Sequence, residues 1–193
     1  MVKQARAWQT RERVLDAAAG EFAVHGYEAT KLQDVIARTD VTKGALYGHF
    51  ESKRRLAAAL VDESTQHWKR IRDACAAGPP SAQAALTELI RGLGAEFDAN
   101  IRFRAAFRLA ADFEPTLDDS DGLFSGIRNA LVASVRGAQQ EMDLTPPYPP
   151  ESLAYLILAV LYGASYMPAW GVPQRAGTEL DRAWRVLCTV LGI

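Results

Sequence analysis

The residues of this chain whose types and spacing suggest chemistry lie within TDVTKGALYGHFESK, residues 39–53. Lys43 and Tyr47 are four residues apart, which places an ammonium and a phenol side by side on a helix. His49 and Lys53 add two further hydrogen-bond donors. Side chains of these types bind phosphate oxygens, so the cluster predicts contact with a nucleic-acid backbone.

Two glycines, Gly44 and Gly48, fall four residues apart in the same segment. A glycine inside a helix costs about 1 kcal/mol relative to alanine. On a helical wheel Leu46 and Phe50 share one face, and the glycines point the opposite way. We interpret the glycine face as a strip without side chains, along which the backbone approaches a groove of duplex DNA. The alternative is a weakened surface helix without a partner.

The elements that must position these residues are two short helices joined by a tight turn, Arg38–Asp40. We expect Thr30 to open the first helix, with Gln33 completing a T-x-x-Q capping box. We expect Thr42 to cap the second helix, which runs to about Phe50. A helix-turn-helix of this form brings the N-terminal residues of its second helix into the major groove of DNA.

The rest of the chain is helical in pattern, and no run of alternating β-branched residues indicates a strand. Glycine and proline break the pattern at residues 78–81 and 143–150. We therefore predict an all-α fold, with a head of three helices over residues 1–53 and a larger helical bundle over residues 54–193. The predicted helices cover residues 10–24, 30 to about 38, 42–50, 52–76, 82–98, 101–111, 123–142, 151–167 and 179–191.

The composition is that of an ordinary globular protein, with 49% apolar and 23% charged residues and a net charge of -1. Residues 1–60 carry ten Lys and Arg against seven Asp and Glu, whereas the remainder carries twelve against sixteen. A basic head on an acidic body suits contact with a polyanion at one end. Cys75 and Cys188 have no metal-ligand spacing, and the N-terminus has no apolar run typical of a signal peptide, so we expect a reduced, cytoplasmic setting.

One stretch without charges, Ser152–Trp170, has about the length of a membrane span. It contains Gly163, Pro168 and three tyrosines, and it lacks a basic flank. We interpret it as a buried helix or a helix at a subunit interface, with a membrane-anchored regulator as the alternative.

The segment ATKLQDVIARTDVTKGALYGHFESK, residues 29–53, resembles the DNA-binding domain of the TetR family of transcriptional repressors. Within that family the chain is most similar to γ-butyrolactone-receptor-like regulators, on the basis of AWQTRERVLDAAAGEF, VTKGALYGHF and FRAAFRLA. The resemblance implies that the larger bundle binds a ligand and dimerises. It also implies DNA contacts by Thr30, Lys31, Gln33, Thr42, Lys43, Gly44, Ala45, Tyr47, His49 and Lys53, of which Tyr47, His49 and Lys53 hold phosphates.

Two positions depart from the family pattern. Thr39 and Asp40 stand where the turn usually has Ala-Gly, and Asp40 adds a negative charge near the proposed DNA contact. Gly48 stands where many members have a bulky residue. We expect both departures to alter operator preference.

The resemblance also implies a cavity in the bundle for a small hydrophobic effector. Aromatic side chains are the candidates to line it: Trp68, Phe97, Phe103, Phe107, Phe124, Tyr155, Tyr162 and Tyr166. Arg72, Asn100 and Arg108 are possible polar partners. The tryptophan that butyrolactone receptors have near the start of the helix beginning Leu123-Phe124 is missing here, so a related signal or an antibiotic-like molecule is an equal candidate.

Nothing in the sequence resembles a catalytic motif such as GxSxG, HExxH or a phosphate loop, so we expect neither an enzyme nor a cofactor or metal site. The predicted function is that of a homodimeric repressor of a palindromic operator in double-stranded DNA. Glu151–Met167 and Glu179–Leu191 are expected to form the dimer interface, as the equivalent pair does in the family. The alternative is a small-molecule sequestering protein with a vestigial DNA head.

Overall fold

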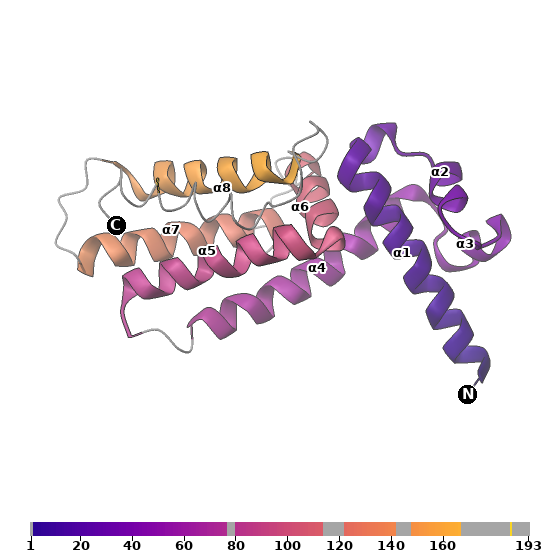
Figure 1. Ribbon diagram of the computed structural model, residues 1–193, viewed down its shortest axis with the longest axis horizontal. Helices are drawn as coiled ribbons and strands as arrows, with labels where there is room; N and C mark the ends of the chain where they lie inside the picture. The colour runs from indigo at the N-terminus through magenta and orange to yellow at the C-terminus, as the bar shows by residue number, and fades with distance from the viewer. Residues whose placement is uncertain (1, 77–79, 114–121, 142–147, 167–185, 187–193) are drawn as a thin grey trace. The chain divides into compact units, whose positions relative to one another are not determined.

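The computed structural model describes residues 2–76, 80–113, 122–141, 148–166 and 186. In this part of the chain all regular structure is helical (Figure 1), which confirms the predicted all-α fold. The helices are α1 (Val2–Ala29), α2 (Leu32–Ala37), α3 (Lys43–His49), α4 (Lys53–Ala76), α5 (Ala82–Ala99), α6 (Ile101–Phe113), α7 (Leu123–Glu141) and α8 (Pro150–Tyr166). The predicted helix over residues 179–191 lies, apart from residue 186, outside the described residues.

The chain divides into two compact units. The first comprises Met1–Thr65 and Ile101–Asp118, and the second comprises Gln66–Asn100 and Asp119–Ile193. The first unit therefore contains the predicted head together with the N-terminal part of α4 and all of α6. A functional boundary after residue 53 stays a prediction.

Helix α1 is longer than its sequence pattern indicated. The sequence pattern predicted a helix over residues 10–24, whereas α1 begins at Val2 and continues through a kink at Gly26 to Ala29. The φ angle of Gly26 is +73°, a left-handed conformation that glycine adopts without steric penalty. A Cβ at this position would lie 2.9 Å from the guanidinium of Arg108, so the glycine also makes room for that side chain.

Helix α2 is shorter than predicted, and its predicted capping box is wrong. The N-cap residue is Lys31, which makes no side-chain capping hydrogen bond. The hydroxyl of Thr30 instead donates to the carbonyl oxygen of Gly26, 2.7 Å away. The kink in α1 places that carbonyl within reach, and this hydrogen bond holds the Thr30 hydroxyl against α1, while α2 begins one residue later, after Lys31.

A hydrophobic core joins the helices of the first unit. Its members come from α1, α2, α3, the start of α4 and α6, and they include Leu15, Phe22, Val35, Leu46, Phe50, Leu56, Leu60 and Leu109. Leu15 and Phe22 are seven residues apart, so both lie on the face of α1 that the other helices cover. Burial of a leucine or phenylalanine contributes about 1.5–3 kcal/mol, so these side chains fix where α3 sits.

Arginine side chains attach α6 to α1 within the first unit. The Nε of Arg102 lies 2.6 Å from Asp16 Oδ1, and its Nη1 lies 2.8 Å from Glu12 Oε2. Burial disfavours the charged guanidinium, but the hydrogen bonds that it donates to Asp16 and Glu12 outweigh this effect and raise the pKa of Arg102. Arg108 donates from Nη1 to the carbonyl oxygen of Ala23 at 3.0 Å.

The second unit is built around α5, α7 and α8, each of which packs on the other two. Its buried side chains include the aliphatic residues Leu89, Leu93, Ile127, Leu131 and Ile157. In the described part of the chain, no helix combines the length and the hydropathy that a membrane span requires.

Candidate nucleic-acid interface

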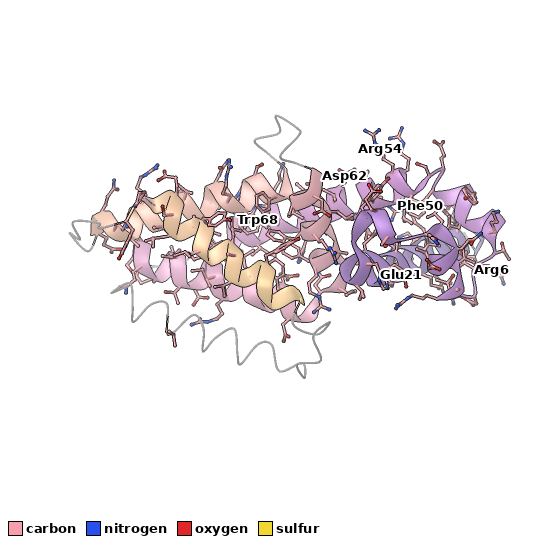
Figure 2. The ribbon with its side chains drawn as sticks, turned by 90° about the horizontal axis from the view of Figure 1, so that it is seen from above. Arg6, Glu21, Phe50, Arg54, Asp62 and Trp68 are labelled. Carbon is pink, nitrogen blue, oxygen red and sulfur yellow. The ribbon has the colours of Figure 1, made fainter. Side chains whose placement is uncertain are left out.

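Helix α3 presents its two glycines to solvent. Gly44 and Gly48 are exposed, and no atom lies within 4 Å of the position that a Cβ would take at either residue. On the other side, Leu46 is fully buried and Phe50 is 5% exposed. Figure 2 shows Phe50 among the helices of the first unit. The predicted orientation is confirmed, with apolar anchors inward and a strip of bare backbone outward.

Both ends of α3 are fixed by hydrogen bonds. At the start, the hydroxyl of Thr42 accepts a hydrogen bond from the backbone N–H of Ala45 at 3.2 Å, which confirms Thr42 as the N-cap. At the end, the N–H of Phe50 donates to the carbonyl oxygen of Leu46 at 2.9 Å. An N-cap of this type contributes about 1 kcal/mol, which offsets part of the cost of two glycines in a helix of seven residues.

Lys43 and Tyr47 stand together on the exposed side of α3. The Lys43 Nζ lies 6.0 Å from the centre of the Tyr47 ring, and Tyr47 is 43% exposed. A cation at this distance from an aromatic face is weakly attracted to it, which keeps both side chains beside the strip. The ammonium and the phenol therefore both remain available to an anion next to the glycines.

The turn between α2 and α3 carries a negative charge that α1 offsets. Nη1 of Arg13 lies 2.9 Å from each carboxylate oxygen of Asp40. Before the turn, Arg38 pairs with Glu21 of α1, a residue that is 5% exposed. The carboxylate of Asp40, which is unusual at this position of the family pattern, is thus paired with Arg13 of α1. This pairing reduces the repulsion between Asp40 and a DNA phosphate.

Lys53 has partners within the protein. Its Nζ lies 2.8 Å from the carbonyl oxygen of Tyr27, 3.3 Å from that of Glu28 and 3.1 Å from that of Thr30. The ammonium group has three hydrogens, and these three carbonyl groups can take all of them. Lys53 also lies over the Tyr27 ring, 4.3 Å from its centre. We therefore do not include Lys53 among the proposed phosphate contacts.

The other predicted contacts differ in accessibility. Thr30 is 1% exposed and its hydroxyl is engaged with Gly26, so it also leaves the proposed set. Ala45 and His49 are half-buried. The side chains that are exposed are those of Lys31, Gln33, Thr42, Lys43 and Tyr47.

Sequence reasoning missed two arginines at the start of α4. Arg54 and Arg55 are exposed, and neither forms an ion pair with another described residue. Figure 2 shows Arg54 projecting from the surface of the first unit. Ser52 precedes them and accepts a hydrogen bond from the N–H of Arg55 at 3.2 Å. The sequence KRR was the available signal, but only its first member has internal partners, and that distinction required the structure.

The predicted pocket residues are divided between the two units. Trp68 and Phe97 are buried in the second unit, whereas Phe103 and Phe107 are buried in the first. Phe124 and Tyr162 are half-buried. Tyr155 is 72% exposed on α8, so we leave it out of a proposed interior pocket. The side chain of Tyr166 lies outside the described residues.

Three possible polar partners of a ligand have partners within the protein. Arg72 donates to the adjacent Asp73, and Asn100 donates to Glu96 at 2.9 Å. Arg108 donates to the backbone of α1, as described above. The structure therefore gives no reason to assign any of these three side chains to a ligand site.

A short helix with a bare, exposed backbone strip, held on a helix-turn-helix by buried anchors, defines a DNA-binding head. Comparison with known proteins supports this interpretation. Residues 14–60 match the family model described as bacterial regulatory proteins, tetR family. The chain thus resembles TetR-family regulators, γ-butyrolactone receptors among them.

Part of the chain is similar to a curated relative. Over 65 residues the chain is 51% identical to the A-factor receptor protein of Streptomyces griseus, a match that covers 34% of this chain and 24% of that receptor. The chain thus matches about a quarter of the length of this curated relative.

Solved structures resemble a larger share of the chain. A γ-butyrolactone receptor described as ArpA-like has a TM-score of 0.76 at 28% identity, covering 95% of this chain and 88% of its own. CprB from Streptomyces coelicolor, solved in complex with its biological operator sequence, has a TM-score of 0.79 at 27% identity, covering 95% of this chain and 89% of its own.

Proposed function

We propose that this protein is a transcriptional repressor that binds a palindromic operator as a homodimer and is released by a small hydrophobic ligand. The observation that carries the proposal is the outward face of α3. Its glycines leave the backbone open, and the buried Leu46 and Phe50 hold that face outward. This arrangement suits a helix whose backbone must come close to a groove.

The proposed DNA contacts fall into two groups. Residues at the start of α3, namely Thr42, Lys43, Gly44 and Ala45, approach the bases. Tyr47 and His49 of α3, together with Lys31 and Gln33 at the start of α2, contact the phosphate backbone of the DNA. Lys53 and Thr30 are no longer in this set, and we add Arg54 and Arg55 to it as contacts to the DNA backbone. The similarity to CprB, which was solved with its operator, supports duplex DNA as the partner of this set.

The dimer is proposed to form through α8 and the helix predicted over residues 179–191. In α8, Tyr155 and Leu156 are 72% and 45% exposed, and they line a shallow depression together with Glu151 and Ser152. Large exposed apolar side chains on one helix favour a protein contact there. A two-fold dimer places its recognition helices about 34–36 Å apart, one turn of DNA, which requires a palindromic site.

The ligand is proposed to bind in the second unit, near Trp68. This side chain is 1% exposed, and its indole N–H has no hydrogen-bond partner among the residues that the structure describes. A buried donor without an acceptor costs about 1–3 kcal/mol. The side chain packs against Gly126, where a Cβ would lie 3.1 Å from Nε1. A small apolar molecule that supplies one acceptor oxygen would satisfy the N–H.

Lys43→Ala and Tyr47→Ala test the function. We expect each variant to bind duplex DNA at least tenfold more weakly than the wild type in fluorescence anisotropy, with the same elution volume in size-exclusion chromatography. Arg128→Ala removes an exposed cation of α7 and serves as the control, which should bind like the wild type.

The result also separates the two candidate functions. Binding by wild type that weakens steeply with salt supports a DNA-binding regulator. A wild type that binds small apolar molecules but no duplex at low salt would instead support the sequestering protein with a vestigial head. Unchanged affinity in both the Lys43 and Tyr47 variants would contradict the contact assignment.

A further inference from the structure

The first turns of α1 lie outside the recognised DNA-binding domain. Helix α1 begins at Val2, whereas the match to the TetR family begins at residue 14. We call residues 2–10 the N-terminal arm. The arm contains Lys3 and Arg6 and no carboxylate, because the first acidic residue of the chain is Glu12. A helix with this composition carries a net positive charge at one end of the head.

The contact between Arg13 and Asp40 shows which side of α1 lies next to the helix-turn-helix. Arg13 reaches the turn before α3 with both contacts at 2.9 Å. Arg6 precedes Arg13 by seven residues, so it lies about 20° away around the helix axis and roughly 10 Å further along it. Arg6 therefore continues the side of α1 that faces the turn leading into α3.

Arg6 differs from Arg11 and Arg13, whose positive charges are each paired with a carboxylate. Arg11 pairs with Glu63 at 2.7 Å, and Arg13 pairs with Asp40. Arg6 is exposed and forms no ion pair with any residue in the described part of the chain. Figure 2 shows Arg6 at one end of the first unit.

We propose that Arg6 binds a DNA phosphate, so that the N-terminal arm extends the interface of α3 along the duplex backbone. A guanidinium group fits phosphate oxygens with two parallel hydrogen bonds. DNA is the partner that the position favours, because the Arg6 side of α1 is continuous with the turn into α3. The contact carries no base information and acts on affinity and register alone. The inference rests on the proposed function, since it requires that α3 engages a duplex.

The dependence of affinity on salt tests this contact without knowledge of the operator. Binding to a random 30-base-pair duplex is measured by fluorescence anisotropy over a series of salt concentrations. Each phosphate contact adds about 0.9 to the slope of log K against log salt. We expect Arg6→Ala to lower the slope by about 0.9 per bound protomer. Arg6→Lys should keep the slope because it keeps the charge.

Trp8→Ala is the matched control within the arm. Trp8 is 63% exposed and lies about 160° around the helix from Arg6, so its removal changes the arm without removing a charge. We expect its slope to equal that of the wild type. An unchanged slope for Arg6→Ala, or an equal loss in Trp8→Ala, would overturn the inference. A wild type that binds no duplex would instead contradict the proposed function itself, so the two failures are distinguishable.

Discussion

Replacing Gly44 by alanine should make the protein more stable while making it a poorer DNA binder. The added methyl group meets no atom within 4 Å, so it introduces no clash in the free protein. Alanine loses less backbone entropy than glycine on helix formation, which should raise the free energy of unfolding by about 0.5–1 kcal/mol. For a chain of this size the melting temperature should rise by about 1–4 °C.

The same methyl group should weaken DNA binding. Gly44 is the second residue of α3, at the end that enters the groove in the proposed complex. A methyl group at residue 44 holds the backbone of α3 away from the duplex. It therefore lengthens the hydrogen bonds that the neighbouring residues of α3 form with DNA in the proposed complex. Loss of one hydrogen bond to a charged group corresponds to about 1.5–3 kcal/mol, which is a tenfold to more than hundredfold loss of affinity.

Thermal unfolding followed by circular dichroism and anisotropy titration with duplex DNA measure the two effects on the same samples. Gly48→Ala is the comparison, because its site is equally open but lies at the far end of α3. We expect the same gain in stability with a smaller loss of binding. A lower melting temperature for Gly44→Ala would refute the open strip, and wild-type affinity would refute the need for close backbone approach.

Three further predictions concern the packing of Leu46, the internal partners of Lys53 and the half-buried thiol of Cys75. Leu46→Ala should lower the free energy of unfolding by about 2–5 kcal/mol in urea titration, because it opens a cavity beneath α3; a loss below 1 kcal/mol would contradict its role as an anchor. Lys53→Met should destabilise the protein by about 1–3 kcal/mol through the loss of its carbonyl partners, yet leave the salt slope of DNA binding unchanged, and a reduced slope would restore Lys53 as a phosphate contact. Burial, and then the charge of Glu88, raise the pKa of the Cys75 thiol. In a Cys188→Ser background Cys75 should therefore react with iodoacetamide at pH 8.5 more slowly in the folded than in the urea-unfolded protein, and Glu88→Gln should narrow the difference.

The recognition helix could be predicted from the sequence in detail. Thr42 as N-cap, Leu46 and Phe50 as inward anchors, and the two outward glycines all follow from a repeat of 3.6 residues per turn. These relations connect residues within one short helix, so they hold before any packing is known. The structure confirms Thr42 as the N-cap and the burial of Leu46 and Phe50.

The roles of Thr30 and Lys53 could not be predicted in this way. Both were expected to contact DNA because of their place in the motif. The kink at Gly26 brings carbonyl oxygens of α1 within reach of both side chains, so their donors are used inside the protein. A helix pattern gives no information on such a kink, because it depends on how the chain leaves α1.

The sequence by itself determined the fold class, the recognition helix and the bare strip on it, because these depend on neighbours a few positions apart. Only the tertiary structure decided which cations remain available for a polyanion. Arg13 and Asp40 are 27 residues apart, and Arg102 and Glu12 are 90 apart. Such pairs form only when packing brings distant segments together, and each pair removes a charge that the sequence alone counts as free.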